Sequence, residues 1–190
     1  YPKIKIVSIP ECVTTISSFC FYHFKNITKV DFTKSSNLYE IKQNSFSETL
    51  IKSINIPSQV TIIGKSAFLN CKKLKTIIFN EGSRLIKIDN YVFSGTSIEI
   101  INIPSTVKKI GECAFLNCKK LETIDFNEDS ELDEIDKNAF SGTSIKIISI
   151  PSTVKKIGEC AFLNCKKLET IDFNKDSELN EIDKNAFSGT

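Results

Sequence analysis

Cysteine and histidine are the residues of this 190-residue chain with the widest chemistry, and it has seven cysteines and one histidine. Their side chains act as nucleophiles, bases and metal ligands. Cys71, Cys118 and Cys165 recur every 47 residues, which indicates one structural position occupied three times. No C-x-x-C pair and no second histidine accompanies them, so the sequence predicts neither a zinc site nor any other metal site. We expect a column of small buried thiols, too far apart for disulfides.

The remaining candidates for chemistry are isolated. An oxidised pair, Cys113–Cys118 or Cys160–Cys165, is the alternative to free thiols, and Cys12 and Cys20 have no assigned place. His23 lacks a second base and an oxyanion loop, so we predict a surface or capping residue and a protein that is not an enzyme.

The acidic segment 128–136 looks superficially like a calcium loop, but it lacks the central glycine of such loops. Leu132 and Ile135 are needed by the core, so we predict a solvated loop with two inward apolar residues. Asn26 begins the sequon Asn26-Ile27-Thr28 and is the predicted glycosylation site if the chain is secreted. No cofactor is predicted.

The overall charge of the chain argues against two classes of binding partner. The chain has 25 basic and 23 acidic residues, a formal net charge of +2, which argues against general binding to nucleic acid or anionic membranes. No apolar run approaches the roughly 18 residues of a membrane span, so direct membrane insertion by this segment is not predicted. The chain does not begin with Met and has no signal-peptide pattern. We therefore expect an excerpt of a longer protein.

A repeat determines where all these residues lie. Ile-Pro pairs recur every 47 residues, and residues 104–143 match residues 151–190 at all but two positions. Phenylalanines recur at alternating spacings of 25 and 22 within these units: Phe21, Phe46, Phe68, Phe93, Phe115, Phe140, Phe162 and Phe187. Residues 1–190 are therefore predicted to form a single domain of four 47-residue double repeats, or about eight coils of 23 or 24 residues.

The structure of one coil can be inferred from the pattern of its side chains. Segment 121–126 has apolar residues at positions one, four and six, and positions four and six share one face of a strand. Val107 and Ile110 turn inward between exposed lysines, Gly111 suits a corner with positive φ, and Ala114-Phe115 forms a short helical or 3₁₀ turn. Stacked coils bury ladders of Ile and Phe. The predicted fold is a leucine-rich-repeat-like solenoid, right-handed and α/β but mostly β, with one parallel sheet.

The repeat also resembles a known family. The pattern I-x-I-P-x-x-V-x-x-I-G-x-x-A-F-x-x-C-x-x-L, complete in segment 148–168, is similar to the BspA-like leucine-rich repeats of surface proteins. The first unit departs from it, with Ser17 in place of Gly and Phe24 in place of Cys. The resemblance implies adhesion and binding to host or matrix proteins at the cell surface or after secretion. An intracellular scaffold or regulatory protein in the cytoplasm is the alternative.

The exposed face of the strands is the predicted protein-binding site, through positions three and five of each strand. Stacking would place these positions in two columns, headed by Ile6 and Ser8. The predicted site comprises Lys29, Asp31, Ser53, Asn55, Thr76, Ile78, Ile100, Asn102, Thr123, Asp125, Ile147, Ser149, Thr170 and Asp172. Self-association through open solenoid ends is a further predicted contact. Rows of lysines and acidic residues should alternate along the stack and give weak ionic support.

Overall fold

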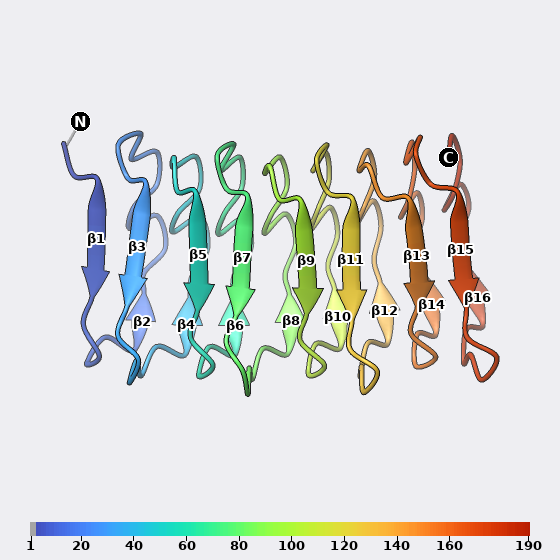
Figure 1. Cartoon of the computed structure of the whole chain (residues 1–190), viewed down its shortest axis with the longest axis horizontal. Coiled ribbons are helices and arrows are strands. Elements are labelled where there is room, and N and C mark those ends of the chain that lie inside the picture. The colour runs from blue at the N-terminus through green and yellow to red at the C-terminus, as the bar shows by residue number, and fades with distance from the viewer. Residues whose placement is uncertain (1–2) are drawn as a thin grey trace.

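The computed structural model describes residues 3–190 and shows a β-solenoid of eight coils (Figure 1). Each coil contributes one four-residue strand to a front layer and one two-residue strand to a back layer. The front strands are β1 (Ile6–Ile9), β3 (Lys29–Phe32), β5 (Ser53–Ile56), β7 (Thr76–Phe79), β9 (Ile100–Ile103), β11 (Thr123–Phe126), β13 (Ile147–Ile150) and β15 (Thr170–Phe173). The back strands are β2 (Thr15–Ile16), β4 (Glu40–Ile41), β6 (Ile62–Ile63), β8 (Lys87–Ile88), β10 (Lys109–Ile110), β12 (Glu134–Ile135), β14 (Lys156–Ile157) and β16 (Glu181–Ile182).

The two layers are hydrogen-bonded differently, which corrects the expectation of one parallel sheet. The short back strands form a continuous parallel sheet of eight strands, whereas the front strands form four separate pairs: β1–β3, β5–β7, β9–β11 and β13–β15. Between β7 and β9 the Glu99 N–H still reaches the Lys75 carbonyl at 3.4 Å, before the strands begin. The front strands therefore lie in register within each 47-residue unit and separate between units.

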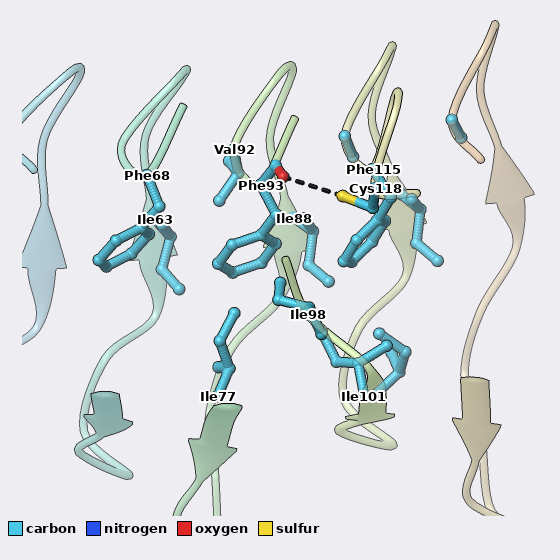
Figure 2. Close-up of a cluster of buried hydrophobic side chains, with 14 of the residues drawn as sticks. Ile63, Phe68, Ile77, Ile88, Val92, Phe93, Ile98, Ile101, Phe115 and Cys118 are labelled. Atoms are coloured by element: carbon cyan, nitrogen blue, oxygen red, sulfur yellow. Dashed lines mark hydrogen bonds between the residues drawn. The ribbon is translucent and has the colours of Figure 1, made fainter. Parts of the chain in front are cut away.

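Alternation of side chains along each front strand explains the core between the layers. In β9, Ile101 and Ile103 are buried, whereas Ile100 and Asn102 point to solvent. The back strands add residues such as Ile88 and Ile110, which are fully buried. Figure 2 shows Ile77, Ile98 and Ile101 from the front side facing Ile88 and Phe93 from the back. The core is a continuous layer because every coil repeats this pattern.

The predicted Phe ladder is present as a stack of parallel rings. Consecutive ring centroids lie 5.2–5.6 Å apart from Phe21 to Phe187, as in the pair Phe93–Phe115 at 5.4 Å. The six inner members, from Phe46 to Phe162, have no exposed surface. Each inner ring therefore contacts a ring on both sides, and Phe68, Phe93 and Phe115 are seen in this arrangement in Figure 2.

The Ala-Phe segment was predicted as a short helical or 3₁₀ turn, and the structure shows turns there but neither kind of helix. No helix occurs in residues 3–190. The Phe115 N–H bonds to the Ala139 carbonyl of the next coil at 2.7 Å, and the Phe93 N–H bonds to the Ala114 carbonyl at 2.9 Å. These donors bond between coils, whereas alternate donors close local turns, as the Leu116 N–H does to the Cys113 carbonyl at 3.1 Å. The local bonds therefore do not join into the continuous ladder of a helix. Positive φ angles at Cys113 (56°) and Asn117 (57°) turn the chain at either side of Phe115.

The glycine that follows three of the back strands, β6, β10 and β14, also has a different role from the one expected. Gly64, Gly111 and Gly158 do not have positive φ angles; the glycines that do are Gly82, Gly95, Gly142 and Gly189. A Cβ atom at Gly158 would lie 2.7 Å from the Lys137 nitrogen and 2.8 Å from the Asp136 carbonyl carbon. Glycine is required there because two coil backbones approach closely.

We therefore expect Gly158→Ala to lower the free energy of unfolding by about 1–3 kcal/mol, because backbone atoms must shift to admit the methyl group. Urea denaturation followed by circular dichroism measures this loss. Lys175→Ala is the control, since Lys175 is exposed and should change stability by less than about 0.5 kcal/mol. Equal midpoints for the two variants would contradict a close backbone approach at Gly158.

Candidate interaction surface

The predicted binding residues lie on the outer face of the front strands. All fourteen are exposed except Asp31, which is half-buried. Parallel register aligns them in two columns, with Ile100 beside Thr123 and Asn102 beside Asp125. The solenoid therefore brings together side chains that are far apart in the sequence, as the repeat predicted.

Exposed isoleucines are the unusual component of this face. Ile100 and Ile147 are 58% and 60% exposed, although isoleucine ordinarily lies in the core. Both occupy position three of the first strand in a pair, and Ile6 occupies the same position in β1 with 58% exposure. Ser53 takes this position in β5, so apolar and polar side chains alternate in this column from β9 to β15, and Ile78 adds an exposed isoleucine to the second column.

Two grooves at the lower edge of the front layer were not predicted. The loop after β11 (127–133) is two residues longer than the loop after β9 (104–108), and the loops after β3, β7, β11 and β15 extend further down in Figure 1. A groove of about 930 Å³ lies over the shorter loop, between Asn80–Arg84 and Asn127–Asp129. A second groove, of about 230 Å³, lies between β3 and β5. The alternating spacing of the phenylalanines was the sequence signal for these uneven loops.

Ion pairs connect neighbouring coils on the back layer. Lys109 lies 2.7 Å from Glu134 and 3.1 Å from Asp136, and Lys156 lies 2.9 Å from Glu181. The two acidic partners raise the pKa of Lys109 against the opposing effect of partial burial. The predicted alternation of lysine and acidic rows is confirmed from β10 to β16, whereas Lys87 lies beside Lys109 without alternation. Each exposed pair adds at most about 1 kcal/mol.

The thiol column is confirmed as an internal feature. Cys71, Cys118 and Cys165 have no exposed surface, and their thiols donate to the carbonyls of Phe46, Phe93 and Phe140 at 3.0–3.2 Å. Threonine hydroxyls of the preceding coils lie 3.2–3.3 Å from the same sulfurs. Burial raises the pKa of Cys71 and of Cys118 to about 11. Figure 2 shows the Cys118 contact. All seven thiols are free, so the oxidised pairs left open as an alternative are absent from this structure.

The thiols should therefore differ sharply in reactivity. At pH 8 we expect a disulfide reagent to modify the exposed Cys12 and Cys20 rapidly and to leave Cys71, Cys118 and Cys165 unmodified, because only the thiolate reacts. Mass spectrometry of the labelled peptides distinguishes the two groups. In denaturant all seven should react, and rapid labelling of Cys118 in the folded protein would contradict its burial.

His23, Asn26 and the acidic segment have separate environments. The His23 Nδ1 lies 3.0 Å from the Glu48 carboxylate, which also contacts Lys25 at 3.2 Å. The hydrogen bond from Lys25 is the largest cause of the lowered pKa of Glu48. Asn26 is exposed, and its glycosylation stays a prediction. Leu132 and Ile135, the two apolar residues of the acidic segment 128–136 that were predicted to point inward, are fully buried.

Two further findings concern metals and membranes. Among residues 3–190, no group of three or more His, Cys, Asp or Glu side chains lies close enough together to hold a metal ion. No helix in that range is long and apolar enough to cross a membrane.

The coil length, the single repeated strand pattern and the exposed front face define a leucine-rich-repeat protein. The chain belongs to the BspA-type leucine-rich-repeat family, whose model matches six copies over residues 1–89 and 86–190. The resemblance found in the sequence is therefore confirmed. No curated protein sequence matches the chain.

Solved structures of surface and repeat proteins share the fold. A leucine-rich repeat protein from Eubacterium ventriosum aligns over 100% of this chain and 44% of its own, with 26% identity and a TM-score of 0.68. A leucine-rich cell surface protein from Faecalibacterium prausnitzii aligns over 98% of this chain and 63% of its own, with 25% identity and a TM-score of 0.52. The pneumococcal vaccine antigen PcpA aligns over 91% of this chain and 51% of its own, with 22% identity and a TM-score of 0.66. At this identity the likeness shows a shared fold alone. The chain thus spans less than two thirds of each.

Proposed function

We propose that this chain is a non-enzymatic adhesion module at a cell surface, which binds a host or matrix protein through the front face. The observation that carries the proposal is the set of exposed isoleucines on the front face, Ile100 and Ile147 together with Ile6 and Ile78, among polar side chains. Isoleucine at these positions adds nothing to the core, and exposed apolar side chains rimmed by polar groups are typical of protein-binding surfaces. The likeness to a leucine-rich cell surface protein supports the surface location.

The repeat supports a multivalent mode of binding. Ile100 and Ile147 have equivalent neighbours, Thr123 and Thr170, in the hydrogen-bonded strands. A partner with a repetitive surface would make the same modest contact several times and gain avidity from their linkage.

The face can be tested by introducing charge into it. The double variant Ile100→Asp, Ile147→Asp should lose binding to immobilised extracellular-matrix proteins, because a carboxylate at an apolar contact must be desolvated. The matched control is Ile62→Asp, Ile86→Asp, since these isoleucines are 47% and 53% exposed at the back layer. Loss of binding in the control alone would place the contact on the opposite layer and would contradict the proposal.

Removing one 47-residue unit tests multivalency. Deleting residues 104–150 joins Ile103 to Pro151 and preserves the Ile-Pro junction. We expect a folded protein with weaker binding, because each coil contacts only its neighbours. Circular dichroism and the same binding assay measure the two effects, and complete loss of folding would contradict this architecture.

The cellular location separates adhesion from the alternative, an intracellular scaffold. Antibody labelling of intact, unpermeabilised source cells supports the adhesion proposal, with permeabilised cells as the control. Labelling only after permeabilisation would contradict it and would favour the intracellular scaffold.

A further inference from the structure

A row of lysines follows the upper edge of the solenoid, where the chain turns from the back layer into β7, β11 and β15 (Figure 1). We call this row the lysine edge; it consists of Lys72, Lys73, Lys119, Lys120, Lys166 and Lys167. All six side chains are exposed. The row contains one lysine pair in every second coil, and no arginine.

The backbone holds each pair outward. Cys118 and Leu121 are fully buried on either side of Lys119 and Lys120, so the lysines between them must point to solvent. The Lys119 N–H bonds to the Asn117 carbonyl at 2.8 Å, and the Ser144 hydroxyl of the next coil donates to the Lys119 carbonyl at 2.9 Å. Lys72 has the same two bonds, to Asn70 and from Ser97, so these two pairs are fastened to their own turn and to the following coil.

The lysine edge differs from the other lysine rows because its charges are largely uncompensated. Within residues 3–190, Lys167 forms an ion pair, at 3.3 Å from Glu122, and the other five lysines form none. On the back layer, by contrast, Lys108, Lys109, Lys155 and Lys156 all form ion pairs with acidic residues. The unpaired ammonium groups of the lysine edge remain available to an external anion.

A hollow lies between two successive pairs. It has a volume of about 500 Å³ and is lined by Lys119, Lys120 and Lys167, together with residues at the start of β9 and β11. Glu99 and Glu122 also line it, and Glu122 is held by Lys146 at 3.5 Å as well as by Lys167. Cationic groups from two different coils therefore converge on one depression.

We infer that the lysine edge binds a linear sulfated polysaccharide that runs along the solenoid axis. Neighbouring parallel strands are just under 5 Å apart, so successive lysine pairs lie about 10 Å apart. This step is close to the length of a disaccharide. Two ammonium groups at each step suit a disaccharide that carries more than one anionic group, as sulfated glycans do. Lysine, a compact charge with rotatable donors, suits sulfates of variable orientation.

Other polyanions fit the lysine edge less well. Duplex DNA has one charge per ~1.7 Å of its axis, which far exceeds the charge density of one lysine pair in every second coil. An anionic membrane is a plane, and it would also approach Glu99 and Glu122, which line the hollow beside the lysine pairs. Hyaluronan has a single carboxylate per disaccharide and would leave half of each lysine pair without a partner.

The test compares two triple variants with the same change in charge. Lys72→Ala, Lys119→Ala, Lys166→Ala removes one lysine from each pair, whereas Lys34→Ala, Arg84→Ala, Lys175→Ala removes three exposed cations from the loops at the opposite edge. Both changes bring the formal net charge from +2 to −1. Circular dichroism verifies that both variants fold. Binding of heparin fragments is measured at several salt concentrations, with hyaluronan, duplex DNA and phosphatidylserine vesicles as comparison probes.

We expect the lysine-edge variant to bind long heparin fragments about tenfold more weakly, since three exposed charge contacts are lost. The slope of log affinity against log salt concentration should fall by about 2 to 3, and the opposite-edge variant should match the wild-type protein. Affinity should also increase with fragment length, because longer chains contact more lysine pairs. Equal weakening in both variants, absence of heparin binding, or equal affinity for hyaluronan, DNA or vesicles would each overturn the inference.

Discussion

Replacing Phe115 with alanine is expected to lower the free energy of unfolding by about 3–5 kcal/mol. The ring is fully buried and stacks on Phe93 at 5.4 Å and on Phe140 at 5.2 Å. Its removal deprives two neighbouring rings of a contact, and the inter-coil hydrogen bonds of the Phe115 turn restrict collapse of the cavity. The shift of the urea midpoint, followed by circular dichroism, measures the loss.

Phe19→Ala is the control for this change. Phe19 lies outside the ring stack and is 53% exposed, so its truncation should cost less than about 1 kcal/mol. The same residue types are exchanged in both variants, and only the position differs. A midpoint for Phe115→Ala that equals that of Phe19→Ala would show that the stack contributes little to stability.

Raising the pH from about 9 to 11 should destabilise the folded protein through its buried thiols. The pKa of Cys71 and of Cys118 is raised from 9.0 to about 11 in the folded state by burial. The unfolded chain therefore loses these protons at lower pH than the folded chain does. Stability is fully present below the unfolded pKa and declines as the pH rises towards the folded pKa, by roughly 1–3 kcal/mol for each thiol.

A double variant separates this effect from other alkaline effects. Cys71→Ser, Cys118→Ser keeps a small hydrogen-bond donor at both positions but removes the titrating thiols. The loss of lysine charge that also occurs at high pH affects the variant and the wild-type protein alike. We expect a shallower decline in urea midpoint for the variant between pH 9 and 11. Parallel declines would contradict the role of the buried thiols.

The repeat, the coil length, the buried ladders and the family could all be predicted from the sequence. Identical side chains at a fixed period must occupy equivalent places in a stack, so Phe115, Cys118 and Ile110 could be assigned to the interior without coordinates. The same reasoning placed Ile100 and Ile147 on the exposed face, because side chains alternate along a strand. Periodicity identified these positions because each depends on one coil and its copies.

The features decided by tertiary structure depend on how one coil meets the next. The sequence alone did not show that the front strands separate between 47-residue units while the back strands form one sheet. Nor did it show that the Phe115 N–H bonds to the next coil instead of forming a helical turn. Gly111 was recognised as a glycine at a corner, but glycine is needed there because the backbone of Asp89 and Asn90 approaches closely. Such contacts arise from the relative offset of neighbouring coils, which only the folded stack defines.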